Sequence, residues 1–355
     1  MKRLSFVCLF FISLLLVSQT NSSLKTDSTS TRALRIADSL KHSDGPYMFI
    51  DKDKIIEKNI VNGTVETKIL GLNTINTEFE TDPFIYHNVS KIAVISDVHG
   101  QYDLTLKILK NNHIIDEKLN WVFGKGHLVI VGDIFDRGPK VTELLWFVYN
   151  LEKQAENNGG KVHFILGNHE FMVMQNDLRY INKKYWLTSK LLNTPYNELY
   201  GKETVLGRWL RSKNTILNID DNLFLHAGIS EVFISNGFNL EETNQKMRQS
   251  LFEDDSDPTW HTLYDKYYDN NGPVWYRGYF SAEFKKSDIN KLLRKLDVKH
   301  VIVGHTSQKQ IESLFHNKIL AVDSSIKNGI YGEMLFIENG KYYRHTMDGE
   351  IIKLK

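Results

Sequence analysis

Five short apolar runs dominate the middle of the chain, and each ends in a polar or charged cluster. They span residues 91–97, 127–133, 161–167, 222–226 and 300–305. Apolar runs without clean alternation are typical of strands buried on both faces. Residues 103–109, between the first two runs, and 141–151, after the second, carry apolar residues at helical spacing. Alternating strands and helices predict an α/β sheet.

The C-terminal part of the chain predicts further strands. Residues 319–323 and 332–338 read as strands, and a turn at Asn339 and Gly340 leads into 341–345 as a hairpin. We therefore expect an α/β fold in which two β-sheets pack together between flanking helices. Residues 171–221 and 231–299 interrupt the pattern with helical patches rich in aromatic residues, which we interpret as insertions whose aromatics serve mainly as core.

The N-terminus has the organisation of an export signal. Lys2 and Arg3 precede an apolar run over residues 4–17, and a polar exit follows. The run is shorter than the roughly 18–20 residues that a membrane span needs, so an uncleaved anchor is the less favoured alternative. We predict a signal peptide over 1–20, a mobile Ser/Thr-rich leader over 21–43 and one domain over 44–355. The mature protein would be periplasmic or secreted, without a stable membrane anchor.

Composition narrows the function classes. The 355 residues contain 44 Lys and Arg against 43 Asp and Glu, with 41% hydrophobic residues, as in an ordinary folded protein. A net charge of +1 gives no reason to expect nucleic acid as a partner. Cys8 is the sole cysteine and lies in the predicted signal peptide, so the mature chain would contain no thiol.

Polar side chains that can bind metal follow all five predicted strands. The candidate ligands are Asp97, His99, Asp133, Asn168, His226 and His305. Because the carboxyl ends of the strands in such a sheet face one rim, these residues should converge. Nitrogen and oxygen donors without thiolate suit Mn, Fe or Zn. We expect two divalent metal ions about 3.5–4 Å apart, bridged by Asp133 and a hydroxide. A polar network without metal is the less favoured alternative, since so many converging donors would rarely all be satisfied.

These blocks and their order resemble the metallophosphoesterase (calcineurin-like) superfamily. Gly132-Asp-Ile-Phe-Asp-Arg-Gly138 and Gly167-Asn-His-Glu170 are similar to its phosphoprotein phosphatase branch. Within that branch, Asp44-Gly-Pro-Tyr47, His226-Ala-Gly228 and Gly272-Pro-Val-Trp-Tyr-Arg277 resemble the Shewanella-like protein phosphatases more than the classical Ser/Thr enzymes. Leu166 departs from the classical pattern, which has Arg there. The resemblance implies the αββα sandwich of the superfamily.

The resemblance also implies a role for each matching residue. Asp97 and His99 would bind one ion, Asn168, His226 and His305 the other, and Asp133 both. His169 would be the general acid, and Asp136 would orient it by accepting its second ring proton. Arg137 and Arg277 would hold the phosphoryl oxygens. The metal-bridging hydroxide would be the nucleophile.

Some candidates have plainer alternatives. His169 could be a structural histidine, and Asp136 could cap the following helix. We interpret Glu170 as a helix-start carboxylate or a partner for an arginine, not as a catalytic residue. Arg208 and Arg211 are expected on a solvated salt-bridge face.

We therefore expect a dinuclear-metal phosphomonoester hydrolase, a protein phosphatase for which the resemblance implies a phosphotyrosine preference. Its partner would be a phosphorylated protein or a small phosphomonoester; the oligomeric state stays open. The alternatives are a dinucleoside-polyphosphate hydrolase and a broad-specificity exported phosphatase. A non-catalytic phosphate-binding module is the least favoured, because no expected ligand is missing.

Overall fold

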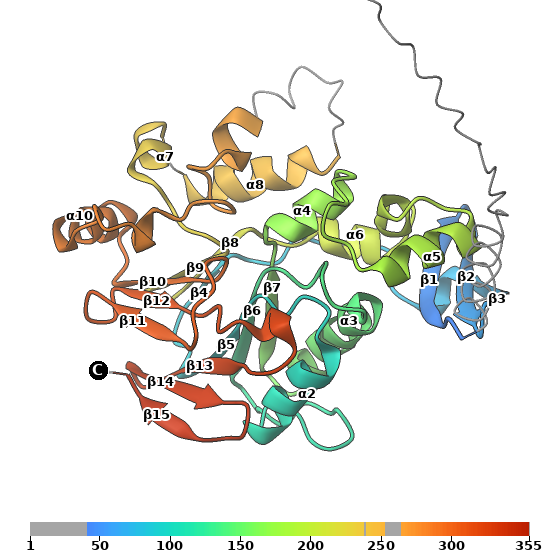
Figure 1. Ribbon diagram of the computed structural model, residues 1–355, viewed down its shortest axis with the longest axis horizontal. Helices are drawn as coiled ribbons and strands as arrows, with labels where there is room; N and C mark the ends of the chain where they lie inside the picture. Colours follow the sequence, from blue (N-terminus) through green and yellow to red (C-terminus); the bar gives the residue numbers. More distant parts are fainter. Residues whose placement is uncertain (1–40, 238, 253–263, 355) are drawn as a thin grey trace, which may run out of the picture.

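The computed structural model describes residues 41–354 except 238 and 253–263 (Figure 1). The predicted signal peptide and the leader up to residue 40 lie outside the described residues. His42, near the end of the predicted leader, is included, and its Nε2 lies 2.9 Å from the Thr188 hydroxyl. Among the described residues, no helix combines the length and the apolar character needed to cross a bilayer.

Two six-stranded sheets form the centre of the described part of the chain. The first has the order β15 (Ile351–Lys353), β14 (Lys341–Thr346), β13 (Glu333–Glu338), β5 (Lys91–Ile95), β6 (His127–Val131) and β7 (Lys161–Ile165). The second has the order β11 (Glu312–Leu314), β12 (Ile319–Ala321), β10 (His300–Val303), β9 (Asn222–Leu225), β8 (Ile216–Ile219) and β4 (Ile85–Tyr86). The five predicted strands correspond to β5, β6, β7, β9 and β10, and the predicted two-sheet α/β fold is confirmed.

The two sheets enclose an apolar layer. Val94 and Val129 of the first sheet belong to the same buried cluster as Phe224 and Ile302 of the second. Both faces of these strands are covered, which explains why the apolar runs lack alternation. Parallel pairing of β5 with β6 and of β6 with β7 directs their carboxyl ends to one edge.

Helices cover the outer faces of the sheets (Figure 1). α2 (Tyr102–Asn111) and α3 (Val141–Asn157) lie beside the first sheet, while α7 (Glu231–Ser235), α8 (Leu240–Ser250) and α10 (Lys286–Leu296) lie on the side of the second. α4 (Asn168–Met174), α5 (Lys183–Leu192) and α6 (Val205–Arg211) follow β7, with a 3-10 turn, η2 (Asn197–Tyr200), between the last two. Further short turns are η1 (Leu72–Thr74), the π-helical η3 (Tyr264–Tyr268), η4 (Gly278–Phe280) and η5 (Ile326–Asn328).

The structure differs from the expected organisation at two places. Residues 171–221 are helical only in part, because β8 and the turn to β9 belong to the second sheet. Residues 44–71 form a separate three-stranded antiparallel sheet of β1 (Asp44–Asp51), β2 (Lys54–Val61) and β3 (Thr64–Gly71). Asp44 anchors that sheet, since its carboxylate accepts bonds of 2.7 Å from both Tyr47 and Thr188.

Candidate active site

All six predicted metal ligands lie just beyond strand ends. Asp97 and His99 follow β5, Asp133 follows β6, Asn168 begins α4 after β7, His226 follows β9, and His305 follows β10. Together with Asp136 and His169, these side chains are only 0–6% exposed. Buried polar atoms need partners, so the cluster must be satisfied internally or by a bound ion.

The backbone at the strand ends is held in an unusual conformation. Six of the ten predicted site residues have a left-handed φ, namely Asp97 (52°), His99 (42°), Asp133 (59°), Asp136 (72°), Arg137 (63°) and His305 (63°). Non-glycine residues seldom adopt this region, and such strain is concentrated at functional sites. At Gly132 a Cβ would come within 2.6 Å of the Gly167 Cα. The residues that follow β6 and β7 can therefore approach this closely only because both are glycine.

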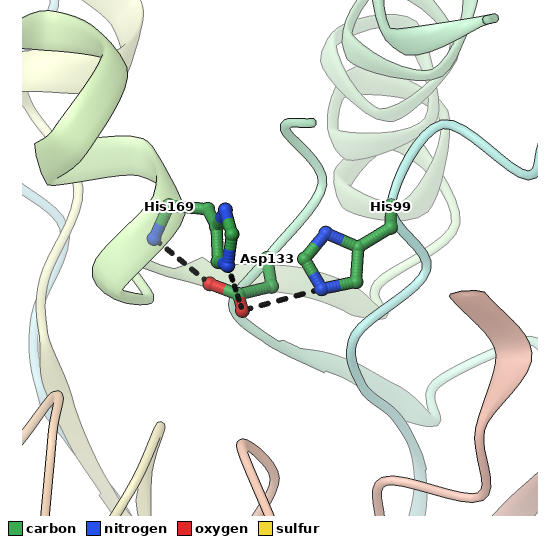
Figure 2. Close-up of side chains that lie close together, drawn as sticks. All are labelled: His99, Asp133 and His169. Atoms are coloured by element: carbon green, nitrogen blue, oxygen red, sulfur yellow. Dashed lines mark hydrogen bonds and ion pairs between the residues drawn. The ribbon is translucent and has the colours of Figure 1, made fainter. Parts of the chain in front are cut away.

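Asp133 lies at the centre of the cluster (Figure 2). Its Oδ2 is 3.5 Å from Nε2 of His99, 3.2 Å from Nε2 of His226 and 3.8 Å from Nε2 of His169. Two groups of ligand atoms share this carboxylate: one contains His99 and His169, and the other His226 and His305. Burial alone would raise the pKa of Asp133, but the surrounding histidines hold it well below its usual range. Asp133 is therefore placed to bridge two cations.

Two histidines are oriented by backbone carbonyls. Nδ1 of His99 lies 2.6 Å from the Phe135 carbonyl oxygen, and Nδ1 of His226 lies 2.8 Å from that of Val131. A donated Nδ1–H fixes each ring so that Nε2 faces Asp133, which is the orientation usual for metal-binding histidines.

The donor set fits a cation. Nε2 of His226 lies 3.2 Å from Asp133 Oδ2, 2.9 Å from the Asn168 side-chain oxygen and 3.2 Å from Nδ1 of His305. Burial lowers the pKa of His226, but the Asp133 carboxylate outweighs it and raises the pKa to about 10. The buried Nε2 of His305 has no hydrogen-bond partner among the described residues. The Asp133 carboxylate, the Asn168 oxygen and Nε2 of His305 would therefore be stabilised by a positive charge among them, which a divalent ion would supply.

Asp97 lies slightly apart from the two groups. Its Oδ2 accepts the Ser96 hydroxyl and, at 2.9 Å, the N–H of His305. Burial and the nearby Asp323 carboxylate raise its pKa well above the ordinary value. A cation next to Asp97 would reverse this effect and keep the carboxylate ionised.

His169 and Asp136 form a buried pair. Nδ1 of His169 is 2.5 Å from the Asp136 carboxylate, and the His169 N–H bonds Asp133 Oδ1 at 3.1 Å. Burial raises the pKa of Asp136, and the bond with His169 opposes that rise. This direct contact supports the interpretation of Asp136 as the residue that orients His169. His169 itself lies within reach of Asp133, so its position alone is compatible with proton transfer or with metal binding.

Glu170 has a role that the sequence reading did not specify. Its carboxylate accepts the N–H groups of Asp133 (2.8 Å), Ile134 (2.7 Å), Phe135 (3.2 Å) and Gly167 (2.7 Å). It stands in the first turn of α4, as expected for a helix-start carboxylate, but it bonds backbone and not an arginine. Glu170 thereby locks the β6 turn that carries Asp133 against the β7 turn that carries Asn168.

We expect Glu170→Gln to lower the free energy of unfolding by about 2–4 kcal/mol. The glutamine amide has only one acceptor oxygen, and its NH2 group would face backbone N–H groups that also need an acceptor. Turnover should fall by about 10²-fold through displacement of Asp133. Thermal melts, metal content and kcat check this. Glu152→Gln is the control, since Glu152 is a partly buried carboxylate that bonds Trp209 and Lys213. If both variants lost equal stability and both kept full turnover, Glu170 would only support the fold.

One cavity contains nearly the whole site. Its walls include Asp97, His99, Asp133, Arg137, Asn168, His169, Arg277 and His305, together with Tyr180, Trp275, Ser307 and Lys327. Arg137 donates through Nε to His99 Nε2 at 3.3 Å and lies over the Tyr180 ring. Arg277 donates to the His305 carbonyl oxygen at 3.0 Å and to the Thr306 hydroxyl at 3.2 Å. Neither arginine has a carboxylate partner among the described residues, which leaves both charges available to an anion.

Tyr180, Trp275 and Lys327 were not identified as site residues from the sequence. Tyr180 is 42% exposed and its ring centroid is 5.3 Å from that of His169, so the core interpretation is wrong for this residue. Trp275 packs edge-on against His305 at 5.6 Å. Trp275 stands in the block 272–277 that carries part of the family resemblance, but only Arg277 of that block was expected at the site. Lys327 reaches the cavity from η5, where its Nζ bonds the Ser307 hydroxyl.

The prediction for Arg208 and Arg211 is correct for one residue only. Arg208 pairs with Glu78 at 2.7 Å and with Glu203 at 2.9 Å. Arg211 is 7% exposed, and among the described residues it donates hydrogen bonds to three backbone carbonyls, so it does not lie on a solvated salt-bridge face.

Comparison with known proteins identifies the relatives of this chain. The family model described as calcineurin-like phosphoesterase matches residues 90–309. The solved cold-active protein-tyrosine phosphatase of a psychrophilic Shewanella species is 41% identical, with a TM-score of 0.82, covering 88% of this chain and 99% of that one. Shewanella-like protein phosphatase 1 of Plasmodium berghei is 26% identical, covering 76% of this chain and 75% of its own. Shewanella-like protein phosphatase 2 of Arabidopsis thaliana is 25% identical, covering 69% and 73%.

Proposed function

Since the chain belongs to the calcineurin-like phosphoesterase family, we propose that it is a protein phosphatase that hydrolyses phosphomonoesters with two divalent cations. The observation that carries the proposal is the Asp133 carboxylate between two groups of histidine ligands. Asp97 and His99 would hold one ion, and Asn168, His226 and His305 the other. When bound, such ions lower the pKa of a water to near 7 and offset the phosphoryl charge. The donor set suits Mn, Fe or Zn.

Arg137 and Arg277 would bind the phosphoryl group. They enter the cavity from different segments, one after β6 and one before η4, and their guanidinium groups match phosphate oxygens in pairs. Lys327 adds a third cation from η5. Because none of the three has a carboxylate partner among the described residues, their charge is directed to the substrate.

His169 would donate a proton to the leaving oxygen through Nε2. Asp136 accepts the bond from Nδ1 and so holds the ring with Nε2 towards the cavity. Asp136 is in this account a positioning residue.

The aromatic walls support phosphotyrosine as the substrate. Tyr180 lies beside the proposed acid and Trp275 beside His305, so a phenyl leaving group would find aromatic faces near the point where its oxygen is protonated. The name of the Shewanella relative, a protein-tyrosine phosphatase, points the same way.

Tyr180→Ala should raise KM for a phosphotyrosine peptide by about 2- to 10-fold relative to the same peptide with phosphoserine, the scale of one aromatic contact. Trp186→Ala is the control, because Trp186 is 55% exposed and does not line the cavity. An equal change in KM for the two peptides would show that Tyr180 does not recognise the aromatic ring.

The proposed function is tested with purified protein before and after chelation. Phosphotyrosine and phosphoserine peptides, a sugar phosphate, a nucleotide and a diadenosine polyphosphate form the substrate panel. We expect turnover of phosphotyrosine peptide, its loss with chelator and its return with Mn, Fe or Zn, and about two metal equivalents by elemental analysis. Faster turnover of the diadenosine compound would favour the alternative hydrolase, and chelator-resistant turnover would exclude the metal mechanism.

We further propose that residues 1–20 direct export and are removed. The support is the sequence of Lys2 and Arg3 followed by the apolar run and polar exit. Cell fractionation with N-terminal sequencing tests it: a cytoplasmic chain that retains Met1 would contradict it.

A further inference from the structure

A second cavity, of about 480 Å³, lies where the ends of α6 and α8 meet the loop before β4. Its described walls include four cationic residues, Lys202, Arg208, Arg211 and Arg248, and two acidic residues, Glu78 and Glu203. None of these six residues lines the catalytic cavity.

The two acidic residues are already paired. Both Glu78 and Glu203 bond Arg208, at 2.7 and 2.9 Å. Lys202, Arg211 and Arg248 therefore have no carboxylate within 4 Å in the part of the chain that the structure describes. These three cations face the cavity without an ion pair to any described residue.

Arg211 is the most deeply buried of the three. Its Nε donates to the Leu251 carbonyl oxygen (3.1 Å), and its Nη1 to those of Tyr200 (2.7 Å) and Gly207 (3.0 Å). Nη2 has no hydrogen bond to any described residue. Burial lowers the pKa of this guanidinium to about 10, against the opposing charge of Glu198. A buried cation bonded only to neutral carbonyls is costly unless an anion joins it.

Arg248 and Lys202 also keep unused donors. Arg248 is half-buried, and its Nη1 donates to the Asn214 side-chain oxygen at 2.6 Å, which leaves Nε and Nη2 unbonded within the described residues. Lys202 Nζ donates to the Phe252 carbonyl oxygen at 2.6 Å, which leaves two of its three N–H groups. The centroid of the Phe252 ring lies 5.7 Å from Lys202 Nζ and 5.8 Å from the Arg211 guanidinium carbon.

We propose that this cavity is a second oxyanion site that binds a phosphate group through Arg211, Arg248 and Lys202. The donors come from the turn before α6, the last residue of α6 and the last turns of α8. Three cations without an ion pair among the described residues match a dianion better than a single carboxylate. Guanidinium groups with a free Nη2 are well suited to phosphate oxygens. The phosphate is either free in solution or carried by a phosphorylated ligand.

Equilibrium dialysis of the metal-loaded full chain against labelled inorganic phosphate tests the site. We expect two equivalents bound by the wild type, one in each cavity. The double variant Lys202→Gln with Arg248→Gln should lose one equivalent and keep kcat on aryl phosphate within about twofold. Arg211 is left intact, because its three carbonyl bonds hold the end of α6. Lys190→Gln with Lys286→Gln removes the same charge from exposed positions outside both cavities and should keep both equivalents.

The outcomes separate this site from the proposed function. Arg137→Gln with Arg277→Gln should lose the other equivalent, so a failure of the proposed function would change that result alone. If Lys202→Gln with Arg248→Gln bound as many equivalents as the wild type, the proposal would be overturned.

A second arm identifies the source of the phosphate. KM is compared for peptides with one and with two phosphorylated residues. A lower KM for the doubly phosphorylated peptide that disappears in Lys202→Gln with Arg248→Gln assigns the site to ligand-borne phosphate. Equal KM values, together with the lost equivalent in dialysis, assign it to free phosphate.

Discussion

Replacing His169 by Asn is expected to lower turnover of the phosphotyrosine substrate by about 10²–10⁴-fold while the metal content stays unchanged. Asn cannot donate a proton as an acid, but it preserves a polar side chain beside Asp133 and Asp136. The loss should grow as the leaving group becomes more basic, because a poor leaving oxygen depends most on protonation. It should therefore be larger for phenyl phosphate than for p-nitrophenyl phosphate.

Steady-state kinetics with a series of aryl phosphates, combined with elemental analysis, decides between two roles of His169. Asp136→Asn is the matched control: it should reduce turnover less and with the same dependence on the leaving group, because Asp136 acts through the 2.5 Å contact with Nδ1. His169 also belongs to a ligand group with His99 and Asp133. A loss of metal with an equal decrease for all leaving groups would therefore assign His169 to the metal.

Asp133→Asn should have the larger effect, with turnover reduced by about 10³-fold or more and the bound metal reduced from two equivalents to one or none. The Asp133 carboxylate is the one shared by both ligand groups found among the described residues. Loss of its charge would weaken the binding of both ions and remove several kcal/mol of charge stabilisation, at 1.36 kcal/mol for each tenfold in rate.

The measurement is metal content by elemental analysis beside kcat. Asp177→Asn is the control, because Asp177 is a nearby half-buried carboxylate that bonds Arg179 and is in neither ligand group. It should keep two equivalents. An Asp133→Asn protein that retained both ions and normal turnover would contradict the dinuclear centre.

The strand positions and the site motifs were predictable because they depend on local sequence. A buried strand needs consecutive apolar residues, and the polar residues after 95, 131 and 303 follow from the point where each strand ends. The sheet β1–β3 was not predicted. Charged and polar residues interrupt β2 and β3, and few side chains of the sheet are fully buried, so these two strands lack the apolar runs that identified the central strands.

Contacts between distant segments were beyond the sequence. Glu170 reads as a helix-start carboxylate, but its bonds to Asp133 and its neighbours exist because β6 and β7 lie side by side. Tyr180 reads as core, and only the packing of its segment against His169 brings it to the cavity. Arg211 has the same local sequence setting as Arg208, yet the fold buries one and pairs the other with carboxylates.

By itself, the sequence determined the two-sheet α/β fold, the family and the set of side chains at the strand ends, since each depends on residue type and on order along the chain. The tertiary structure alone decided which wall groups meet the proposed substrate, how Asp133 stands between the histidines, and where cations lack partners. These properties depend on distances between segments far apart in the chain, and the free energy of a charge or a hydrogen bond is set by what surrounds it in space.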